Sequence, residues 1–283
     1  MSITVSALYR YPIKSCRGMP LDEALIGDQG IMLDREYMVV DERGMFVSQR
    51  NGKTGDDLTY GVRSMCLIAP SIRGNNLTVS APDMPGLEFP LYQATGEKLK
   101  VRVWKSVCEA QEISPMVSAW FTEYMSRERP GRYRLVRMSD NFTRASSAGF
   151  ALTAFSDGFP FLVVSQESLD ELNRRITGAP VAINRFRPNI VISGCSTPHA
   201  EDTMDRIEIN GVIFQGHWIC DRCPMPGVEQ ETAKKDGRPL LALAKYRRMK
   251  EGSDKVQFGR NFNHLCPGRI RVGDEVEVVY WSA

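Results

Sequence analysis

The sequence lacks the features that mark membrane, secreted and nucleic-acid-binding proteins. None of its 283 residues belongs to an apolar run approaching the roughly 20 residues that cross a membrane as a helix. The 36 Lys and Arg residues nearly balance the 34 Asp and Glu residues without any block of like charge, so we expect neither a nucleic acid polymer nor a membrane as partner. The N-terminal stretch "MSITVSALYR" has no signal-peptide pattern, which favours a cytoplasmic location.

Cysteine and histidine are too few for the usual structural frameworks. The seven cysteines are odd in number and scattered, which argues against a disulfide framework. One CxxC motif, Cys220 and Cys223 in "HWICDRCPMPG", has no second CxxC and only three histidines to complete a zinc site. A thioredoxin-like dithiol precedes a helix, which Pro224 and Pro226 disfavour. Zinc, a redox dithiol, buried thiols and an anchor for a softer metal all remain open from these residues alone.

Short strands separated by turns dominate the first hundred residues, a pattern typical of a small β-barrel or sandwich. The stretches "DERG" and "RGNN" indicate hairpins. Strands recur later in "FPFLVVS", "PNIVISG" and "IRVGDEVEVVYW". The sequence therefore predicts a mainly β fold with attached helices (α+β). We expect a β-barrel-like domain over 1–110, a helix and linker region over 111–149, and a second domain over 150–283 that packs against the first.

Three segments have the pattern of helices. In "SPMVSAWFTEYMS" a stripe of apolar residues recurs at helical spacing and is expected to face the core. The stripe consists of Met116, Val117, Trp120, Phe121 and Tyr124. In "SQESLDELNRRI" the helix starts either with Ser168 and Glu171 as a capping box or with Ser165 as N-cap. "RPLLALAKYRRM" is the third candidate, and the polar stretch 138–149 predicts a linker or mobile loop.

Several basic residues lie next to predicted strands. Lys14 and Ser15 follow the first strand in "YPIKSCRG", and Arg35 precedes another in "LDREYMVV". Arg187 comes just before the strand of "RFRPNIVISG", where Pro188 restricts the backbone. Guanidinium groups suit phosphate and the polar edges of a heterocycle, although each residue alone also fits a solvated surface charge.

In their order along the chain, several segments resemble the MOSC-domain proteins, the family named after the C-terminal part of molybdenum cofactor sulfurases. The segments are "YPIKSCRG", "LDREYMVV", "FSDGFPFLVVSQESLDELN", "FRPNIVISG", "CDRC", "FGRNF" and "GRIRVGDEVEVV". The resemblance covers nearly the whole chain and is strongest to hydroxylaminopurine reductases and amidoxime-reducing components. It implies a MOSC N-terminal β-barrel followed by a MOSC β-barrel domain.

The resemblance also implies roles for individual residues. Cys223 matches the family's catalytic cysteine, which binds molybdenum, and Cys220 matches a less essential neighbour. The residues that match the cofactor-binding positions are Lys14, Ser15, Arg35, Asp157, Arg187 and Asn189. The implied cofactor is the molybdenum cofactor, a molybdopterin with or without an attached nucleotide. Thiolate and dithiolene sulfurs suit this soft metal. Pyridoxal phosphate binding is associated with the family only as a general label.

The implied activity is the reduction of small N-hydroxylated substrates such as hydroxylamines, amidoximes and hydroxylaminopurines. The sequence has no cluster-spaced cysteines and no Gly-rich nucleotide turn, and it ends at Ala283 where some relatives continue into a ferredoxin domain. We therefore expect a separate flavin or iron–sulfur reductase as electron donor. Pro226 and Gly227 replace hydroxyl residues common in the family. The alternatives are a sulfur carrier with a Cys223 persulfide and a non-catalytic cofactor carrier.

Overall fold

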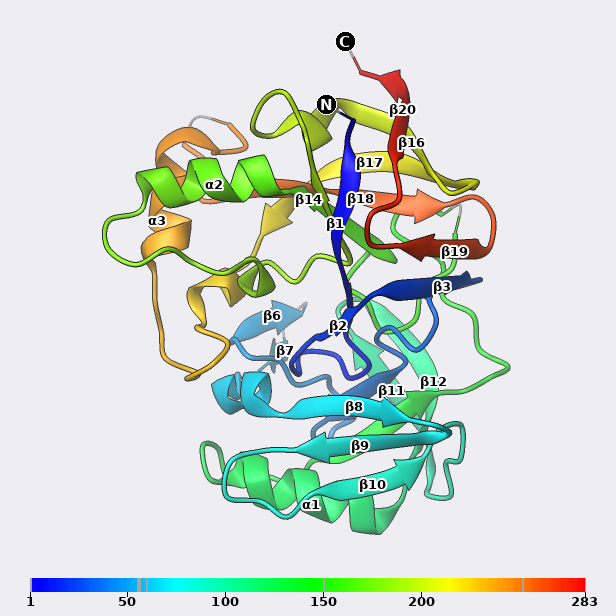
Figure 1. Ribbon diagram of the computed structural model, residues 1–283. Coiled ribbons are helices and arrows are strands. Elements are labelled where there is room, and N and C mark those ends of the chain that lie inside the picture. The colour runs from blue at the N-terminus through cyan, green and yellow to red at the C-terminus, as the bar shows by residue number, and fades with distance from the viewer. Residues whose placement is uncertain (1, 55–56, 60, 150, 251, 283) are drawn as a thin grey trace.

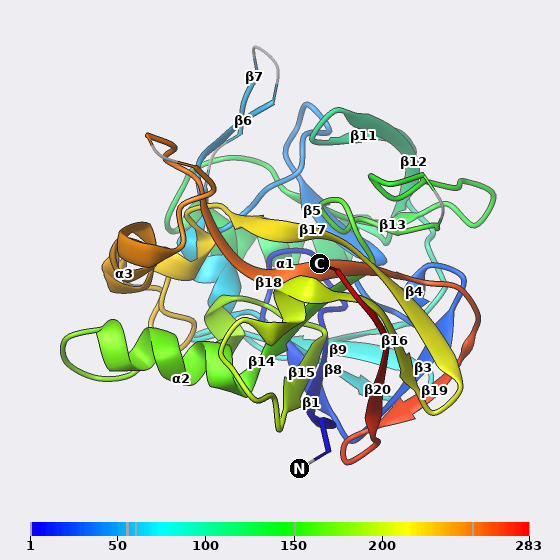
Figure 2. The same ribbon diagram turned by 90° about the horizontal axis from the view of Figure 1, so that it is seen from above.

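The structure is a computed structural model that describes residues 2–54, 57–59, 61–149, 151–250 and 252–282. Over these ranges the chain is mainly β, with three α-helices attached to curled sheets (Figures 1 and 2). The predicted fold class, mainly β with attached helices, is confirmed.

One large sheet dominates the half of the molecule drawn at the top of Figure 1. Its strand order is β2-β1-β15-β14-β18-β17-β16-β20. The strands are β1 (Thr4–Arg10), β2 (Met19–Leu21), β14 (Phe161–Ser165), β15 (Ile190–Ser193), β16 (Met204–Ile209), β17 (Val212–Arg222), β18 (Val256–His264) and β20 (Val276–Trp281). Neighbours pair antiparallel except β14 and β15, which are parallel.

Smaller sheets make up the rest. They have the orders β11-β12-β13-β5, β10-β9-β8, β19-β3-β4 and β6-β7. Their strands are β3 (Glu23–Gly27), β4 (Gly30–Ile31), β5 (Tyr37–Val40), β6 (Gly52–Thr54), β7 (Asp57–Thr59), β8 (Ala69–Arg73), β9 (Asn76–Ser80), β10 (Leu87–Pro90), β11 (Lys98–Val103), β12 (Ser106–Glu112), β13 (Arg134–Met138) and β19 (Gly268–Arg271). The predicted "RGNN" hairpin is the β8–β9 turn.

Two N-terminal strands pair with strands from the C-terminal half of the chain. β1 pairs with β15 through partners such as Leu8 and Ile190, and β3 pairs with β19. In Figure 1, β1 therefore runs in dark blue among green, yellow and red strands. The chain then forms most of the smaller sheets, drawn below in Figure 1, and comes back to the large sheet at β14. Lys14 and Arg35 lie in the segments that follow β1, and Arg187 lies just before β15, the strand that pairs with β1.

Helix α1 (Pro115–Ser126) buries the apolar stripe predicted for it, with one exception. Val117, Trp120 and Phe121 are buried against the core, but Met116 is 68% exposed. The helix begins after Ser114, whose hydroxyl accepts a hydrogen bond from the Val117 N–H at 3.2 Å. Met116 lies in the same first turn as the buried Val117 but on another side of the helix, so its predicted place in the core was wrong.

Helix α2 (Gln166–Arg175) begins at the alternative N-cap. The Ser165 hydroxyl accepts a hydrogen bond from the Ser168 N–H at 3.1 Å. Ser168 is instead buried inside the first turn and donates to the buried carboxylate of Glu201 at 2.8 Å. The capping box was therefore wrong, and Ser165 is the N-cap. Helix α3 (Arg238–Tyr246) contacts α2.

The polar stretch 138–149 is built into the fold. The Thr153 N–H donates to the Arg144 carbonyl at 2.9 Å, and the Ser147 N–H donates to the Gly158 carbonyl at 2.7 Å. Arg144 itself is only 8% exposed. The interpretation of this stretch as a mobile loop missed the buried arginine, because a polar composition does not reveal which charged side chain turns inward.

A half-buried histidine near α3 predicts an acid-sensitive fold. Burial, followed by the nearby Arg247 and Arg175 and opposed by Glu171, lowers the pKa of His199 to about 4. An unfolded chain takes up this proton near its ordinary pKa of 6.5, so the free energy of unfolding falls as the pH drops from 6.5 towards 4. We expect this residue to contribute about 1–2 kcal/mol to that fall, less than a fully buried imidazole would.

The matched variant is His199→Asn, because His199 has a φ of 63° and asparagine tolerates the left-handed region. Urea titrations at pH 7 and pH 4.5 measure the effect. The variant should lose less stability between the two pH values than the parent does. Equal losses would mean that His199 does not carry the acid sensitivity.

Candidate active site

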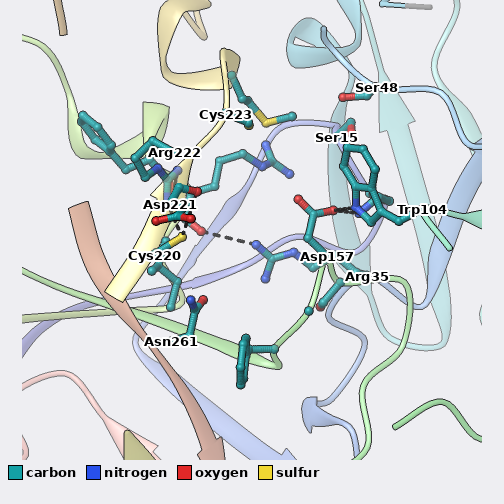
Figure 3. Close-up of a pocket in the computed structure, with 18 of the residues that line it drawn as sticks. Ser15, Arg35, Ser48, Trp104, Asp157, Cys220, Asp221, Arg222, Cys223 and Asn261 are labelled. Atoms are coloured by element: carbon teal, nitrogen blue, oxygen red, sulfur yellow. Dashed lines mark hydrogen bonds and ion pairs between the residues drawn. The ribbon is translucent and has the colours of Figure 1, made fainter. Parts of the chain in front are cut away.

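A cavity of about 730 Å³ lies between the two halves of the molecule. Every residue predicted for the site lines it: Lys14, Ser15, Arg35, Asp157, Arg187, Asn189 and Cys223. Figure 3 shows Cys220, Asp221 and Arg222 on one side of the cavity, Ser15, Ser48 and Trp104 on the other, and Asp157 between them. The structure thus brings together residues that are more than 200 positions apart in the sequence.

Lys14 and Asp157 form an ion pair at the cavity wall. The Lys14 ammonium group donates to Asp157 Oδ1 and to the Phe155 carbonyl, the latter at 2.8 Å. Trp104 Nε1 donates to the same carboxylate oxygen at 2.8 Å. Burial raises the pKa of Asp157, but Lys14, Trp104 and Arg50 outweigh burial and hold the pKa well below its usual range. The cavity leaves 60% of the Asp157 side chain exposed, so the surrounding protein removes only part of its water, and the group lines the cavity as a carboxylate.

Two guanidinium groups meet at a buried tyrosine. Arg35 and Arg187 each lie with Cζ 4.2 Å from the centre of the Tyr11 ring. Arg35 Nη1 donates to Asp34 and to Asn189 Oδ1, the latter at 2.9 Å. Asn189 is 2% exposed, and its Nδ2 donates to the backbone, so its amide is held in place and holds Arg35 in turn. The sequence placed these side chains near strand ends, but their shared tyrosine was not foreseen.

Three of the predicted residues have a left-handed backbone. The φ angle is 67° at Ser15, 53° at Arg35 and 56° at Arg187. Residues with a Cβ adopt this region at a cost, and such residues cluster at sites where the surrounding structure holds a side chain in a required position. The left-handed backbone at these three positions is therefore a second reason, besides the cavity itself, to treat this as a candidate site.

The two cysteines of the CxxC motif differ in their surroundings. Cys220 is in β17, and its sulfur accepts a hydrogen bond from Arg222 Nη1 at 3.2 Å. Burial raises the pKa of Cys220, and Arg222 opposes this shift. Cys223 follows the strand as a free, half-buried cysteine that lines the cavity, and no hydrogen bond from the described residues engages its thiol. Its sulfur is therefore the better placed of the two to bind an added metal.

The structure weighs against two other readings of the motif. In the described part of the chain, no group of three or more His, Cys, Asp or Glu residues lies close enough to hold a metal ion, so zinc has no ligand set there. The motif leads into a short 3-10 turn (Met225–Gly227) and not into an α-helix, unlike a thioredoxin-like dithiol. Of this turn, Met225 lines the cavity, whereas Pro226 is buried and Gly227 shapes the backbone through its N–H, which donates to the Pro224 carbonyl at 3.0 Å.

Some cavity residues were missed by reading the sequence. Arg50 lies over the Trp104 ring, with its Cζ 4.8 Å from the ring centre, and Trp104 in turn packs against Phe46. Ser48 and Asn261 also line the cavity. Ser48 and Trp104 lie in segments predicted as strands, and Asn261 lies in "FGRNF", a segment quoted only for the family resemblance. Nothing in a strand pattern tells which residue faces a cavity formed by another part of the chain.

The charges around the cavity favour an anionic ligand. Lys14 and Lys255 are paired with Asp157 and Asp221, but Arg187 donates to the Cys16 carbonyl at 2.6 Å and has no carboxylate within ion-pair distance in the described chain. Arg187 is 8% exposed, and burial lowers its pKa. A buried charge is costly without a partner, so an anion in the cavity would stabilise this arginine. The residues therefore fit a phosphate-bearing cofactor.

Comparison with protein families agrees with this site. Residues 2–128 match the MOSC N-terminal beta barrel domain and residues 152–277 match the MOSC domain. The chain belongs to the MOSC-domain family.

Individual relatives give the family more detail. The chain is 32% identical to human mitochondrial amidoxime-reducing component 1, over 96% of this chain and 82% of that protein. It is 30% identical to human mitochondrial amidoxime reducing component 2, with the same coverage. It is also 29% identical to the zebrafish molybdenum cofactor sulfurase, over 93% of this chain and 32% of that protein. The chain is thus part of a family associated with the molybdenum cofactor and with reductases.

The pyridoxal phosphate label, the cytoplasmic location and the domain boundaries are not addressed by these similarities. Neither the family descriptions nor the names of these relatives mention pyridoxal phosphate. Among the described residues, no helix is both long and apolar enough to span a membrane. The cytoplasmic location and the domain boundaries at 110 and 149 stay predictions.

Proposed function

We propose that this protein is a molybdenum-cofactor-dependent reductase of N-hydroxylated compounds, with Cys223 as the protein ligand to molybdenum. The observation that carries the proposal is one cavity that contains both a free cysteine and a buried arginine, Arg187, that has no carboxylate within ion-pair distance among the described residues. The relatives named amidoxime-reducing components support the activity.

The cavity residues divide the work of binding. Arg187, Arg35 and Lys14 supply fixed N–H donors and positive charge for a phosphate or for the pterin ring. Asn189 keeps Arg35 in position through the hydrogen bond at 2.9 Å. The Asp157 carboxylate suits N–H groups on a heterocycle, because it is held ionised by its neighbours.

The reaction needs two electrons and two protons for each N–O bond, giving an amine or amidine and water. When bound, the molybdenum cofactor supplies a two-electron centre that accepts oxygen. Cys223 would supply a soft thiolate ligand. Near Cys220 the wall includes Phe159, whose ring centre lies 5.3 Å from that of Trp218, a residue 60% exposed. This aromatic pair offers a contact for the flat part of a substrate.

The electrons would come from a separate flavin or iron–sulfur reductase. The relatives' names call them components, which describes a part of a larger system. In this protein the cavity residues bind and orient, and none belongs to a nucleotide-binding turn in the sequence.

The test uses protein produced together with the machinery that makes the cofactor. We expect the purified protein to contain molybdenum and pterin, and to reduce benzamidoxime with a reduced viologen as electron donor. NADH or NADPH alone should give no turnover, and adding a flavin or iron–sulfur reductase should restore it. Amine or amidine formation is measured by chromatography.

Other outcomes would contradict parts of the proposal. Turnover with NADPH alone would remove the need for a partner. Fully loaded protein that stays inert with the viologen on several N-hydroxylated compounds would favour a non-catalytic carrier. Protein without molybdenum that carries sulfane sulfur on Cys223 would favour a sulfur carrier.

A further inference from the structure

Four consecutive carbonyl groups beside the cavity receive hydrogen bonds from two buried cations. Arg144 Nη1 donates to the carbonyls of Ala154 at 2.9 Å and Ser156 at 2.6 Å, and its Nη2 donates to that of Asp157 at 2.9 Å. Lys14 Nζ donates to the carbonyl between them, that of Phe155, at 2.8 Å. The segment 154–157 is therefore held by Arg144 and Lys14 together.

Burying the charge of Arg144 to hold this segment costs free energy. Arg144 is 8% exposed, burial lowers its pKa, and in the described chain no carboxylate lies within ion-pair distance of its guanidinium group. Its charge is balanced only by carbonyl dipoles and by the more distant Asp157. A guanidinium group has its N–H donors on separate nitrogens in one fixed plane. The three donors of a lysine ammonium group are on a single nitrogen, so lysine cannot reproduce the geometry of these three hydrogen bonds.

The held segment ends at the cavity. Ser156 and Asp157 both line it, and the Asp157 Oδ1 atom accepts hydrogen bonds from Lys14 and Trp104. A shift of the 154–157 backbone would move the carboxylate away from both donors. The position of Asp157 thus depends on Arg144, although Arg144 does not line the cavity.

We propose that Arg144 is a positioning residue that fixes Asp157, and with it Lys14, at the cavity wall. The assignment concerns the empty protein and the loaded one alike. Its consequence for catalysis rests on the proposed function, because only a bound cofactor or substrate would use the carboxylate.

The test follows Trp104, whose indole N–H reports on Asp157. The protein has four tryptophans, so a ¹⁵N-labelled sample gives four indole signals, and Trp104→Phe identifies the one of interest. In Arg144→Lys prepared without cofactor, we expect the Trp104 indole signal to shift and its hydrogen exchange with water to become about tenfold faster. The signals of Trp120 and Trp281 should stay in place.

Arg260→Lys is the matched control. Arg260 is 6% exposed and also donates to backbone carbonyls, those of His217 at 2.8 Å and Asp202 at 2.6 Å, and these residues do not line the cavity. Unlike Arg144 it also pairs with a carboxylate, that of Asp205. This variant should lose thermal stability as Arg144→Lys does, but it should leave the Trp104 signal unchanged. In loaded protein, Arg144→Lys should retain about tenfold less pterin after gel filtration, and Arg260→Lys should retain it fully.

The outcomes separate this assignment from the proposed function. An unchanged Trp104 signal in Arg144→Lys, with the same loss of melting temperature as the control, would make Arg144 a purely structural residue. Arg144→Gln, which removes the charge and keeps two N–H donors, is the second variant. If neither variant folds while Arg260→Lys does, the assignment is withdrawn. If the parent binds no molybdenum, the proposed function fails, and the Trp104 measurement still decides the role of Arg144.

Discussion

Cys223→Ser should abolish molybdenum retention while leaving the fold intact. Serine is close to cysteine in size, but an alcohol oxygen is a poor substitute for a soft thiolate as a molybdenum ligand. Because no hydrogen bond from the described residues engages the Cys223 thiol, its loss should cost the empty protein little stability. Metal analysis of freshly purified protein, together with a melting curve, measures both effects.

Cys220→Ser is the control for this prediction. Its sulfur already accepts a hydrogen bond from Arg222 at 3.2 Å, which a serine oxygen can also accept. This variant should keep most of its molybdenum. Wild-type metal content in both variants would show that Cys223 is not the ligand, and the main proposal would then be wrong.

Arg187→Ala should weaken cofactor binding by about 1.5–3 kcal/mol, the range for a lost hydrogen bond from a charged donor to phosphate or pterin. This corresponds to roughly a 10- to 150-fold loss of affinity. Arg187 is buried at the cavity, and no carboxylate of the described residues lies within ion-pair distance of it, so a bound anion would give its charge a partner. Pterin fluorescence after dialysis against buffer of known volume measures the affinity.

Arg185→Ala is the matched control two positions away. Arg185 is equally buried, but it pairs with Asp236 at 2.8 Å and does not line the cavity. Its replacement should lower the melting temperature, because it leaves Asp236 with one cation fewer, and should leave pterin affinity unchanged. Equal affinity in Arg187→Ala and the parent would make Arg187 a structural charge.

We expect Arg35→Ala and Lys14→Ala to weaken binding in the same range as Arg187→Ala.

The local elements of the fold could be predicted because their causes are local. A strand needs alternating or continuous apolar residues, and a helix needs apolar residues at helical spacing with a cap at its start. The predictions went wrong where residues distant in the sequence determine what a side chain contacts. Ser168 is not the cap because the buried Glu201 takes its hydroxyl, and the polar composition of 138–149 did not reveal that Arg144 turns inward to hold carbonyls.

The sequence by itself determined the mainly β class, the start of each helix to within a turn, and, through its order of motifs, which residues to suspect around Cys223. Only the tertiary structure decided how they meet. Lys14 reaches Asp157 across 143 positions, and Arg35 reaches Asn189 across 154. Contacts between residues so far apart in the sequence leave no periodic pattern in the chain, because they arise when β1 pairs with β15 in the large sheet. The same pairing of β1 with β15 places Arg187 in a cavity where no carboxylate of the described chain pairs with it, a property of packing that no local pattern contains.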